Sequence, residues 1–173
     1  MPTLNTVISE QDIQEKVKSL ADKISSDYNG KNLVLVGVLK GAFMFFADLV
    51  RQLSIPLTID FVRLASYGGD TKSSGQIKIT KDIEFDIKGL DVLIVEDIVD
   101  SGLTLSFLVE HLMRFQPGSV KICALIDKKE RREKDIIVDY SGFFLKKGFL
   151  VGYGLDFNEE YRGLPEISEL CFL

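Results

Sequence analysis

Several residue types from which common functional sites are built are scarce in this sequence of 173 residues. It contains one histidine, which excludes a histidine-rich metal site, and no tryptophan. Its two cysteines, Cys123 and Cys171, each lie in an apolar run and have no spacing typical of metal ligands. We therefore expect two reduced, buried thiols, as is usual for a cytoplasmic protein.

An excess of positive charge and a long apolar segment are also missing. The formal net charge is −5, so we expect no polynucleotide partner. The N-terminal stretch MPTLNTVISEQDI lacks the basic and apolar regions of a signal peptide. The most apolar span, 33–50, contains Lys40 and Asp48 and is interrupted by Gly37 and Gly41, whereas a membrane helix needs about 20 mostly apolar residues. These observations predict a soluble, cytoplasmic protein with no membrane partner.

Strand and helix patterns alternate along the chain. The length and a hydrophobic content of 46% fit a single domain, which we expect to span 1–173. Buried strands are expected at 33–38, 57–64, 91–97 and 120–126, a half-exposed strand at 76–80, and helices at 42–53 and 105–115. A further helix is expected to begin at 9–12, which resembles a capping box, and to have its apolar face at 13–24. This order predicts an α/β fold with a mainly parallel, twisted sheet and helices on both faces. Between the strands, 65–76 has three glycines and no periodicity, which predicts a long flexible loop.

Three acids stand where an apolar run ends in the stretch VLIVEDIVDSGLTLSFL. Glu96, Asp97 and Asp100 are followed by the small-residue turn 101–104 and then by helical spacing. Ligands of parallel sheets bind at the carboxyl ends of strands, and a helix N-terminus favours an anion. Carboxylates repel phosphate but bind sugar hydroxyls or Mg²⁺, so the stretch suggests a phosphorylated sugar. The alternative is a capped helix with an acidic first turn.

The segment VLIVEDIVDSGLT resembles the phosphoribosyl pyrophosphate signature of type I phosphoribosyltransferases. Its E-D-x-x-D-[ST]-G-x-T form is similar to the 6-oxopurine branch, the hypoxanthine-guanine phosphoribosyltransferases. The resemblance extends to GVLKGA, RLASYGGDTKSSGQIKI, LIDK and FLVGYGLDFNEEYRGLP. It implies a type I core with a small hood, a homodimer or homotetramer, and a function in purine salvage. The implied reaction is Mg²⁺-dependent transfer of phosphoribosyl to N9 of hypoxanthine or guanine, giving IMP or GMP and pyrophosphate.

The resemblance also implies roles at the sugar end of the site. Glu96 and Asp97 would hold the ribose hydroxyls, directly or through Mg²⁺, and Asp100 would serve as the proton-transfer group near purine N7. The 5′-phosphate would bind the turn made of Ser101, Gly102, Leu103 and Thr104. Mammalian members commonly have lysine where this chain has Leu103, which affects phosphate contacts more than function.

Further roles follow for the purine. Lys128 would donate to purine O6, Phe149 would stack on the base, and the carbonyl of Leu150 would meet its Watson–Crick edge. Gly148 replaces a lysine that is frequent before the stacking aromatic.

On the pyrophosphate side, Asp156 would ligate Mg²⁺ and Arg162 would contact pyrophosphate. Lys40 and Gly41 would form the pyrophosphate loop, where the family has an unusual cis peptide between these two residues. The family's loop that closes over the reacting centre would begin with Ser66 and Tyr67.

Other interpretations compete at several positions. Lys128 begins the mixed-charge run KKERREK, which is typical of a solvated face, and we assign Lys129, Arg131 and Arg132 to such a face. Phe149 could belong to the core. We assign no chemistry to His111 and structural roles to Asp48 and Asp60.

The function of the whole chain also has alternatives. A protein that senses phosphoribosyl pyrophosphate and regulates nucleic acid would share the signature, although it needs a basic or motif-bearing surface. Transfer to xanthine or adenine is a second alternative, and the sequence cannot rank hypoxanthine, guanine and xanthine.

Overall fold

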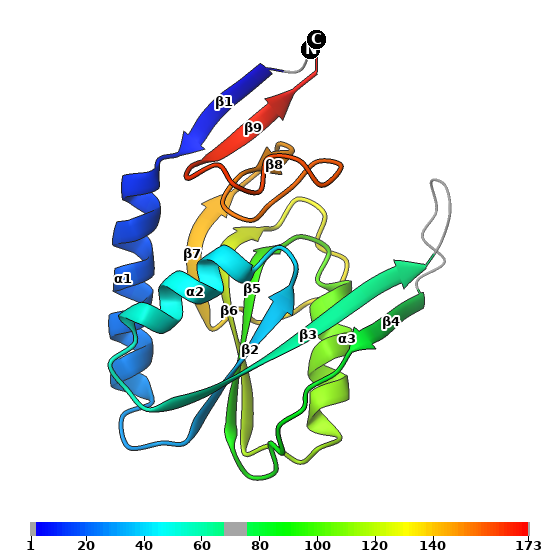
Figure 1. The fold of residues 1–173 in the computed structure, drawn as a ribbon. Coiled ribbons are helices and arrows are strands. Elements are labelled where there is room, and N and C mark those ends of the chain that lie inside the picture. Colours follow the sequence, from blue (N-terminus) through cyan, green and yellow to red (C-terminus); the bar gives the residue numbers. More distant parts are fainter. Residues whose placement is uncertain (1–2, 68–75, 173) are drawn as a thin grey trace.

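The computed structural model describes residues 3–67 and 76–172, and its largest element is a six-stranded sheet (Figure 1). The strand order is β4-β3-β2-β5-β6-β7. The strands are β2 (Leu33–Leu39), β3 (Leu57–Tyr67), β4 (Gln76–Lys81), β5 (Asp91–Val99), β6 (Ser119–Lys128) and β7 (Tyr140–Leu145). From β3 to β7 every pairing is parallel, and only β4 pairs antiparallel at its edge. The predicted mainly parallel sheet is confirmed.

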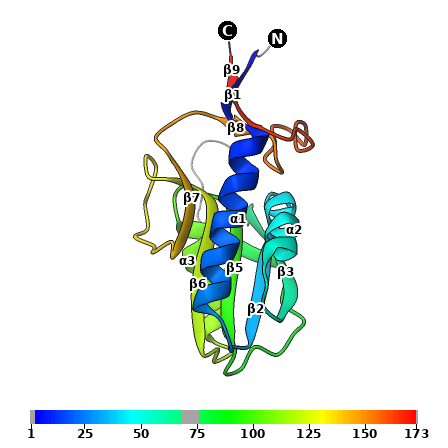
Figure 2. The ribbon, with the colours of Figure 1, turned by 90° about the vertical axis from the view of Figure 1, so that its left-hand side faces the viewer.

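Helices cover both faces of this sheet (Figures 1 and 2). The strand residues alternate between the faces: Leu33 and Leu35 pack in one core with α1 (Glu10–Asp27) and α2 (Phe43–Gln52). Val34 and Val36 pack in a second core with α3 (Leu103–Met113). Burial on both faces explains why β2, β5 and β6 read as continuous apolar runs.

The first helix begins as its sequence predicts. Ser9 is the N-cap of α1, and its Oγ accepts a hydrogen bond of 3.1 Å from the backbone N–H of Asp12. The apolar side chains at spacings of four, three and four are buried in the core, namely Ile13, Val17, Leu20 and Ile24. The capping residue therefore fixes where this amphipathic face starts.

A second, three-stranded sheet forms the predicted small hood. Its order is β1-β9-β8, with β1 (Thr3–Ile8), β8 (Leu150–Val151) and β9 (Ile167–Cys171). Figure 1 shows it above the end of the large sheet toward which β2 and β5 point. The individual strands were not predicted, because β1 is mostly exposed and has no clear apolar alternation. The hood lies over the carboxyl ends of the parallel strands, where ligands of such sheets bind.

The predicted loop 65–76 was wrong in its bounds. β3 continues to Tyr67 and β4 starts at Gln76, with Ser66 paired to Ile77 and Tyr67 to Gln76. Ser66 and Tyr67 are thus the last residues of a strand, because antiparallel pairing to β4 extends the hairpin beyond what residue periodicity reveals. Positions 68–75 of the predicted loop lie outside the described residues. Of the helices that are described, none is long and apolar enough to cross a membrane.

Asp60 and Asp48, which were predicted to be structural, and His111, to which we assigned no chemistry, have partners within the chain. The Asp60 carboxylate accepts backbone hydrogen bonds from Glu84 and Phe85 at 2.7 and 2.9 Å. Asp48 Oδ2 accepts a hydrogen bond of 2.5 Å from the Tyr153 hydroxyl. His111 Nε2 lies 2.8 Å from Asp82 Oδ2.

Candidate active site

A cavity of about 520 Å³ opens between the hood and the carboxyl ends of β5 and β6. Asp97 and Asp100 line it from the end of β5, and Lys128 lines it from the last position of β6. The hood side contributes Phe149, Leu150 and Asp156. Six of the residues predicted for a ligand site, which come from widely separated segments, are therefore brought to one space.

The two adjacent acids of β5 are buried. Glu96 and Asp97 are only 8% and 9% exposed. Glu96 Oε1 accepts the backbone N–H of Asp97 at 3.0 Å, and Asp97 Oδ1 accepts that of Ile98 at 2.7 Å. Burial raises the pKa of both carboxyls, and the neighbouring Asp97 charge raises the pKa of Glu96 further. Two buried acids side by side favour a cation or hydroxyl donors as their partner.

Asp100 lies just beyond β5 and has an unsatisfied oxygen. Its Oδ1 is buried and has no hydrogen-bond partner among the described residues. A buried polar atom normally has a partner, so this oxygen is available to a donor that arrives with a ligand. The cavity wall is where such a donor would meet it.

The turn after Asp100 does not contain an acidic helix cap. The N-cap of α3 is Gly102, with φ of +81° and no side-chain cap hydrogen bond, and the first turn has no acid. Leu103 N donates to Ser101 Oγ at 3.3 Å. The alternative of a capped helix with an acidic first turn is therefore wrong, because Glu96 and Asp97 belong to β5 and Asp100 lies before the N-cap. The turn 101–104 follows Asp100 but does not itself line the cavity.

Lys128 and Phe149 both line the cavity. Lys128 is 6% exposed, and its Nζ donates to the carbonyl of Gly148 at 3.0 Å, so it does not belong to a solvated face. Phe149 is 48% exposed and meets Phe157 edge-on with ring centroids 5.5 Å apart, so it is not a core residue. Leu150, by contrast, is buried in β8. A cation and an accessible aromatic ring thus face one cavity.

Comparison with known proteins agrees with this arrangement. A family model described as "Phosphoribosyl transferase domain" matches residues 6–158. A hypoxanthine-guanine phosphoribosyltransferase of Bacillus subtilis (strain 168) is 48% identical over 164 residues, which cover 95% of this chain and 91% of the relative. A hypoxanthine phosphoribosyltransferase of Salmonella typhimurium is 43% identical and covers 99% of this chain and 97% of the relative. The chain belongs to the hypoxanthine-guanine phosphoribosyltransferase family.

The fold of this phosphoribosyltransferase is also that of solved relatives. The crystal structure of a hypoxanthine phosphoribosyltransferase from Staphylococcus aureus matches it with a TM-score of 0.92 and 43% identity, covering 96% of this chain and 90% of that one. The predicted type I fold class and family are therefore confirmed. The roles of individual residues remain predictions.

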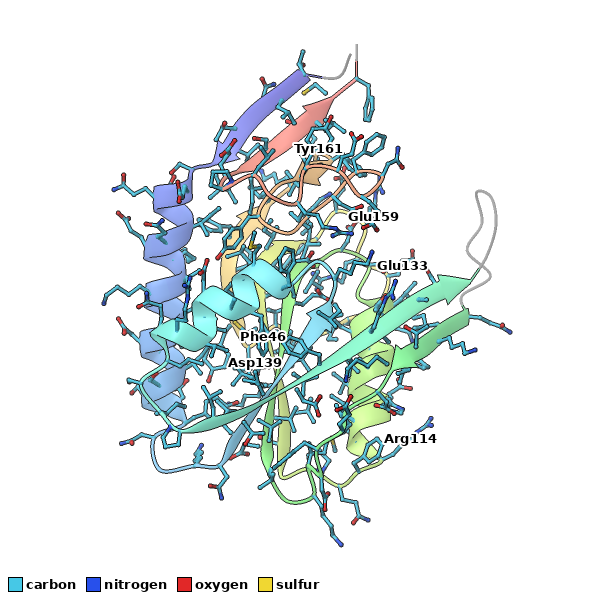
Figure 3. All side chains as sticks on the ribbon, viewed as in Figure 1. Phe46, Arg114, Glu133, Asp139, Glu159 and Tyr161 are labelled. Atoms are coloured by element: carbon cyan, nitrogen blue, oxygen red, sulfur yellow. The ribbon has the colours of Figure 1, made fainter. Side chains whose placement is uncertain are left out.

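The two cations predicted to bind pyrophosphate are joined by an acid that sequence reasoning missed. Glu159 Oε2 lies 2.9 Å from Lys40 Nζ, and Glu159 Oε1 lies 3.2 Å from Arg162 Nη2. Hydrogen bonds from Lys40 and Arg162 hold the pKa of Glu159 below its ordinary value. Glu159 is labelled in Figure 3 at the hood end of the molecule. Nothing in its sequence context distinguished it from other acids of an exposed turn.

Arg162 also contacts Asp156, a residue of the cavity wall. Its Nη2 lies 3.0 Å from Asp156 Oδ1, and its Nη1 donates to the carbonyl of Gly154 at 2.7 Å. Its Nε is buried without a partner among the described residues. An anionic ligand could therefore gain a hydrogen bond from this side chain.

The predicted cis peptide is displaced by one bond. It joins Leu39 to Lys40, not Lys40 to Gly41. The resemblance identified the loop but could not separate two adjacent bonds. The next residue, Gly41, lies so close to Asp97 that it has no room for a side chain. A Cβ at this position would lie 2.8 Å from Cγ of Asp97. Only glycine allows the backbone to approach the carboxylate this closely.

Arg132 was wrongly assigned to a solvated face. Its side chain is 15% exposed and pairs with Asp127, 5% exposed, at 2.5 Å. Lys129 and Arg131 are exposed as predicted, although Arg131 lines the rim of the cavity. The signal that could have identified Arg132 is Asp127, an acid in the buried part of β6. A buried acid needs a partner, and Arg132 is one of the cations in the run that follows it.

The donor atoms present fit a magnesium ion that is shared with phosphates. Among residues 3–67 and 76–172, no three His, Cys, Asp or Glu side chains gather into a metal site of their own. Mg²⁺ usually binds one or two carboxylates and completes its shell with water and phosphate oxygens. Asp97, Asp100 and Asp156 supply such oxygens to one cavity, and Asp100 Oδ1 is without a partner in the described chain.

Proposed function

We propose that this chain transfers the 5-phosphoribosyl group from phosphoribosyl pyrophosphate to N9 of hypoxanthine or guanine, giving IMP or GMP and pyrophosphate in purine salvage. The observation that carries the proposal is the meeting of Asp100, Lys128 and Phe149 in one cavity of about 520 Å³. That volume is within the range typical of small-molecule sites. Membership of the family supports the same conclusion.

The purine would lie against Phe149. The exposed ring offers a stacking surface, and the Leu150 carbonyl would accept a hydrogen bond from the Watson–Crick edge. Lys128 would donate to O6. Its ammonium has three N–H donors and one is used by the Gly148 carbonyl, which leaves others for the base. An O6 acceptor fits this lysine better than the amino group of adenine would.

The sugar phosphate would extend away from the base along the ends of the strands. Glu96 and Asp97 would bind the ribose hydroxyls, and the backbone N–H groups of turn 101–104 would bind the 5′-phosphate at the start of α3. Lys40, Gly41 and Arg162 would bind pyrophosphate. The hairpin that ends in Ser66 and Tyr67 would carry the segment that closes over the reacting centre.

In the reaction, the bond between C1 of the ribose and the pyrophosphate oxygen breaks, and its electron pair leaves with pyrophosphate. A bond forms between C1 and purine N9, and the base loses one proton. The unsatisfied Oδ1 of Asp100 would accept that proton at N7 or stabilise it there. Lys128 would stabilise the charge that develops on O6.

Phosphoribosyl pyrophosphate is strongly anionic and the protein has a net charge of −5, so a bound metal cation would reduce their repulsion. Mg²⁺ would be held by Asp156 and by Glu96 and Asp97, and when bound it would neutralise phosphate charge. We further propose that residues 1–173 act as one domain in the cytoplasm, as a homodimer or homotetramer without a nucleic-acid or membrane partner. The named relatives support the transferase and give no support to the regulatory alternative.

The decisive experiment offers the protein phosphoribosyl pyrophosphate and Mg²⁺ with hypoxanthine, guanine, xanthine or adenine in separate assays. Ultraviolet absorbance reports nucleotide formation. Turnover with hypoxanthine or guanine that stops when the metal is chelated is the expected result. Tight binding of the sugar phosphate with no turnover of any base would contradict the proposal.

A further inference from the structure

We propose that Arg132 is a positioning residue for the transfer reaction and that it holds Asp100 and Lys128 in a fixed relation to each other. The inference rests on the proposed function, since these two residues are the ones to which we give roles at N7 and O6. Arg132 itself lies outside the wall of the cavity, so it would act through them.

The guanidinium bridges the two strands just where their pairing stops. The β5–β6 register ends at Val99 and Asp127. One residue farther, Arg132 Nε donates to the carbonyl of Asp100 at 3.0 Å, and Nη2 donates to the carbonyl of Lys128 at 3.1 Å. Arg132 therefore connects the backbones of the two residues just beyond the last paired positions of β5 and β6.

Two further contacts fix the orientation of the guanidinium. Nη2 also donates to Asp127 Oδ1 at 2.5 Å, and Nη1 donates to the carbonyl of Ile136 at 3.5 Å. Asp127 is almost fully buried, and a buried carboxylate needs a hydrogen-bonding partner, which Arg132 supplies. Arginine presents its donors in a rigid plane, which allows one side chain to hold several acceptors in a set geometry.

Backbone hydrogen bonds, and not the guanidinium, hold the neighbouring turn 101–104, which we propose binds the 5′-phosphate. The carbonyl of Ser101 accepts backbone hydrogen bonds from Glu133 and Lys134 at 2.9 and 3.0 Å. A Cβ at Gly102 would lie 3.2 Å from Cδ of Arg132, so the aliphatic part of the arginine packs beside the turn. The guanidinium thus binds the carbonyls of Asp100 and Lys128, whereas the aliphatic stem packs against the turn. A substitution that keeps the stem but removes the guanidinium can test the two contributions separately.

Lysine at position 132 provides that separation. It keeps the stem and the positive charge, but a single ammonium cannot hold the carbonyls of Asp100, Lys128 and Ile136 together. Small displacements of reacting groups reduce rates strongly, because catalysis depends on the alignment of the groups. The Arg132→Lys variant should therefore turn over the purine more slowly and bind it more weakly, while its affinity for phosphoribosyl pyrophosphate is retained.

The test measures both substrates in steady state, with thermal unfolding in parallel, for the wild type, Arg132→Lys and Arg114→Lys. Arg114 is exposed and lies at the end of the molecule opposite the hood (Figure 3). We expect Arg132→Lys to lower kcat with hypoxanthine by about tenfold or more and to raise the KM for hypoxanthine. The KM for phosphoribosyl pyrophosphate should stay within about twofold of the wild type, and Arg114→Lys should change neither.

Asp127→Asn distinguishes positioning from general stability. Asparagine keeps an oxygen that can accept a hydrogen bond from Nη2, and it leaves the Arg132 guanidinium bonded to the carbonyls of Asp100 and Lys128. The kcat of Asp127→Asn should therefore fall much less than that of Arg132→Lys, even if both variants unfold at a lower temperature. An unchanged kcat and hypoxanthine KM in Arg132→Lys would overturn the inference. The inference would also be overturned if Arg132→Lys and Asp127→Asn lost kcat equally and in proportion to their losses of thermal stability. A wild type inactive with every base would instead overturn the proposed function, and this inference with it.

Discussion

The carboxylate of Glu159 lies 2.9 Å from the ammonium of Lys40, although 119 positions separate the two residues in the chain. Its other oxygen lies 3.2 Å from Arg162. An acid of the chain therefore pairs with the two cations that we propose bind pyrophosphate. Pyrophosphate bound to these cations would therefore compete with this acid.

The Glu159→Gln variant should bind pyrophosphate more tightly. The neutral amide would compete less well for Lys40 and Arg162. Exposed ion pairs are weak, so we expect affinity to rise by only about twofold to fivefold. Calorimetric titration with magnesium pyrophosphate measures this, with Glu160→Gln, at the exposed neighbouring position, as the control. Unchanged or weaker binding in Glu159→Gln would show that Glu159 does not compete with the ligand.

Asp100→Asn should reduce turnover far more than sugar-phosphate affinity. The amide can no longer accept the purine proton, and general-base contributions are typically about 10²- to 10⁴-fold. The measurement is kcat with hypoxanthine, together with the dissociation constant of phosphoribosyl pyrophosphate. Asp22→Asn, on the exposed face of α1, is a matched control. Wild-type turnover in Asp100→Asn would remove Asp100 from the chemistry.

Stability should depend on pH through the buried acids of β5. Burial raises the pKa of Glu96 in the folded state, so the folded protein binds this proton more tightly than the unfolded chain does. The resulting stabilisation is fully present below the ordinary carboxyl pKa and is lost as the pH rises through the raised value.

Glu96→Gln tests this pH dependence, because it keeps the shape of the side chain without the titrating charge. Relative to the wild type, the variant should gain stability as the pH increases from the acid range. Thermal unfolding of both proteins at a series of pH values, without metal, gives the difference. If the difference does not change with pH, Glu96 is ionised as easily in the folded as in the unfolded state.

Gly41→Ala should damage both stability and activity. The added methyl group would meet the Asp97 carboxylate, with Cγ only 2.8 Å away, and overpacking of this kind typically costs about 1–3 kcal/mol. Gly163→Ala is the matched control, because nothing lies within 4 Å of a Cβ at that position. Chemical denaturation and the transferase assay measure the two effects. Equal behaviour of the two variants would mean that the loop at Gly41 moves away without cost.

Much of the large sheet could be predicted because its strands are buried on both faces. Continuous apolar runs such as those of β2 and β5 have few other structural interpretations. The acids at the end of β5 were likewise predicted as part of a site, because they stand at the carboxyl end of a parallel strand and before a turn that opens a helix.

The remaining features depend on contacts that local sequence does not encode. β1 is exposed and pairs with β9, with Thr3 opposite Cys171, so neither strand has a strong pattern of its own. The partners of Arg132 and Glu159 likewise became visible only in three dimensions. Charged residues in a polar run look alike until the fold buries one of them or brings a counter-ion beside it.

The accessible ring of Phe149 offers an optical readout of the base site. The protein contains no tryptophan, so Phe149→Trp would introduce the only indole of the chain, at a position that is 48% exposed and lines the cavity. Its emission would arise without background from other indoles and would change when a purine stacked on it. Stopped-flow fluorescence could then time the arrival of the base and the departure of the nucleotide separately from the chemical step.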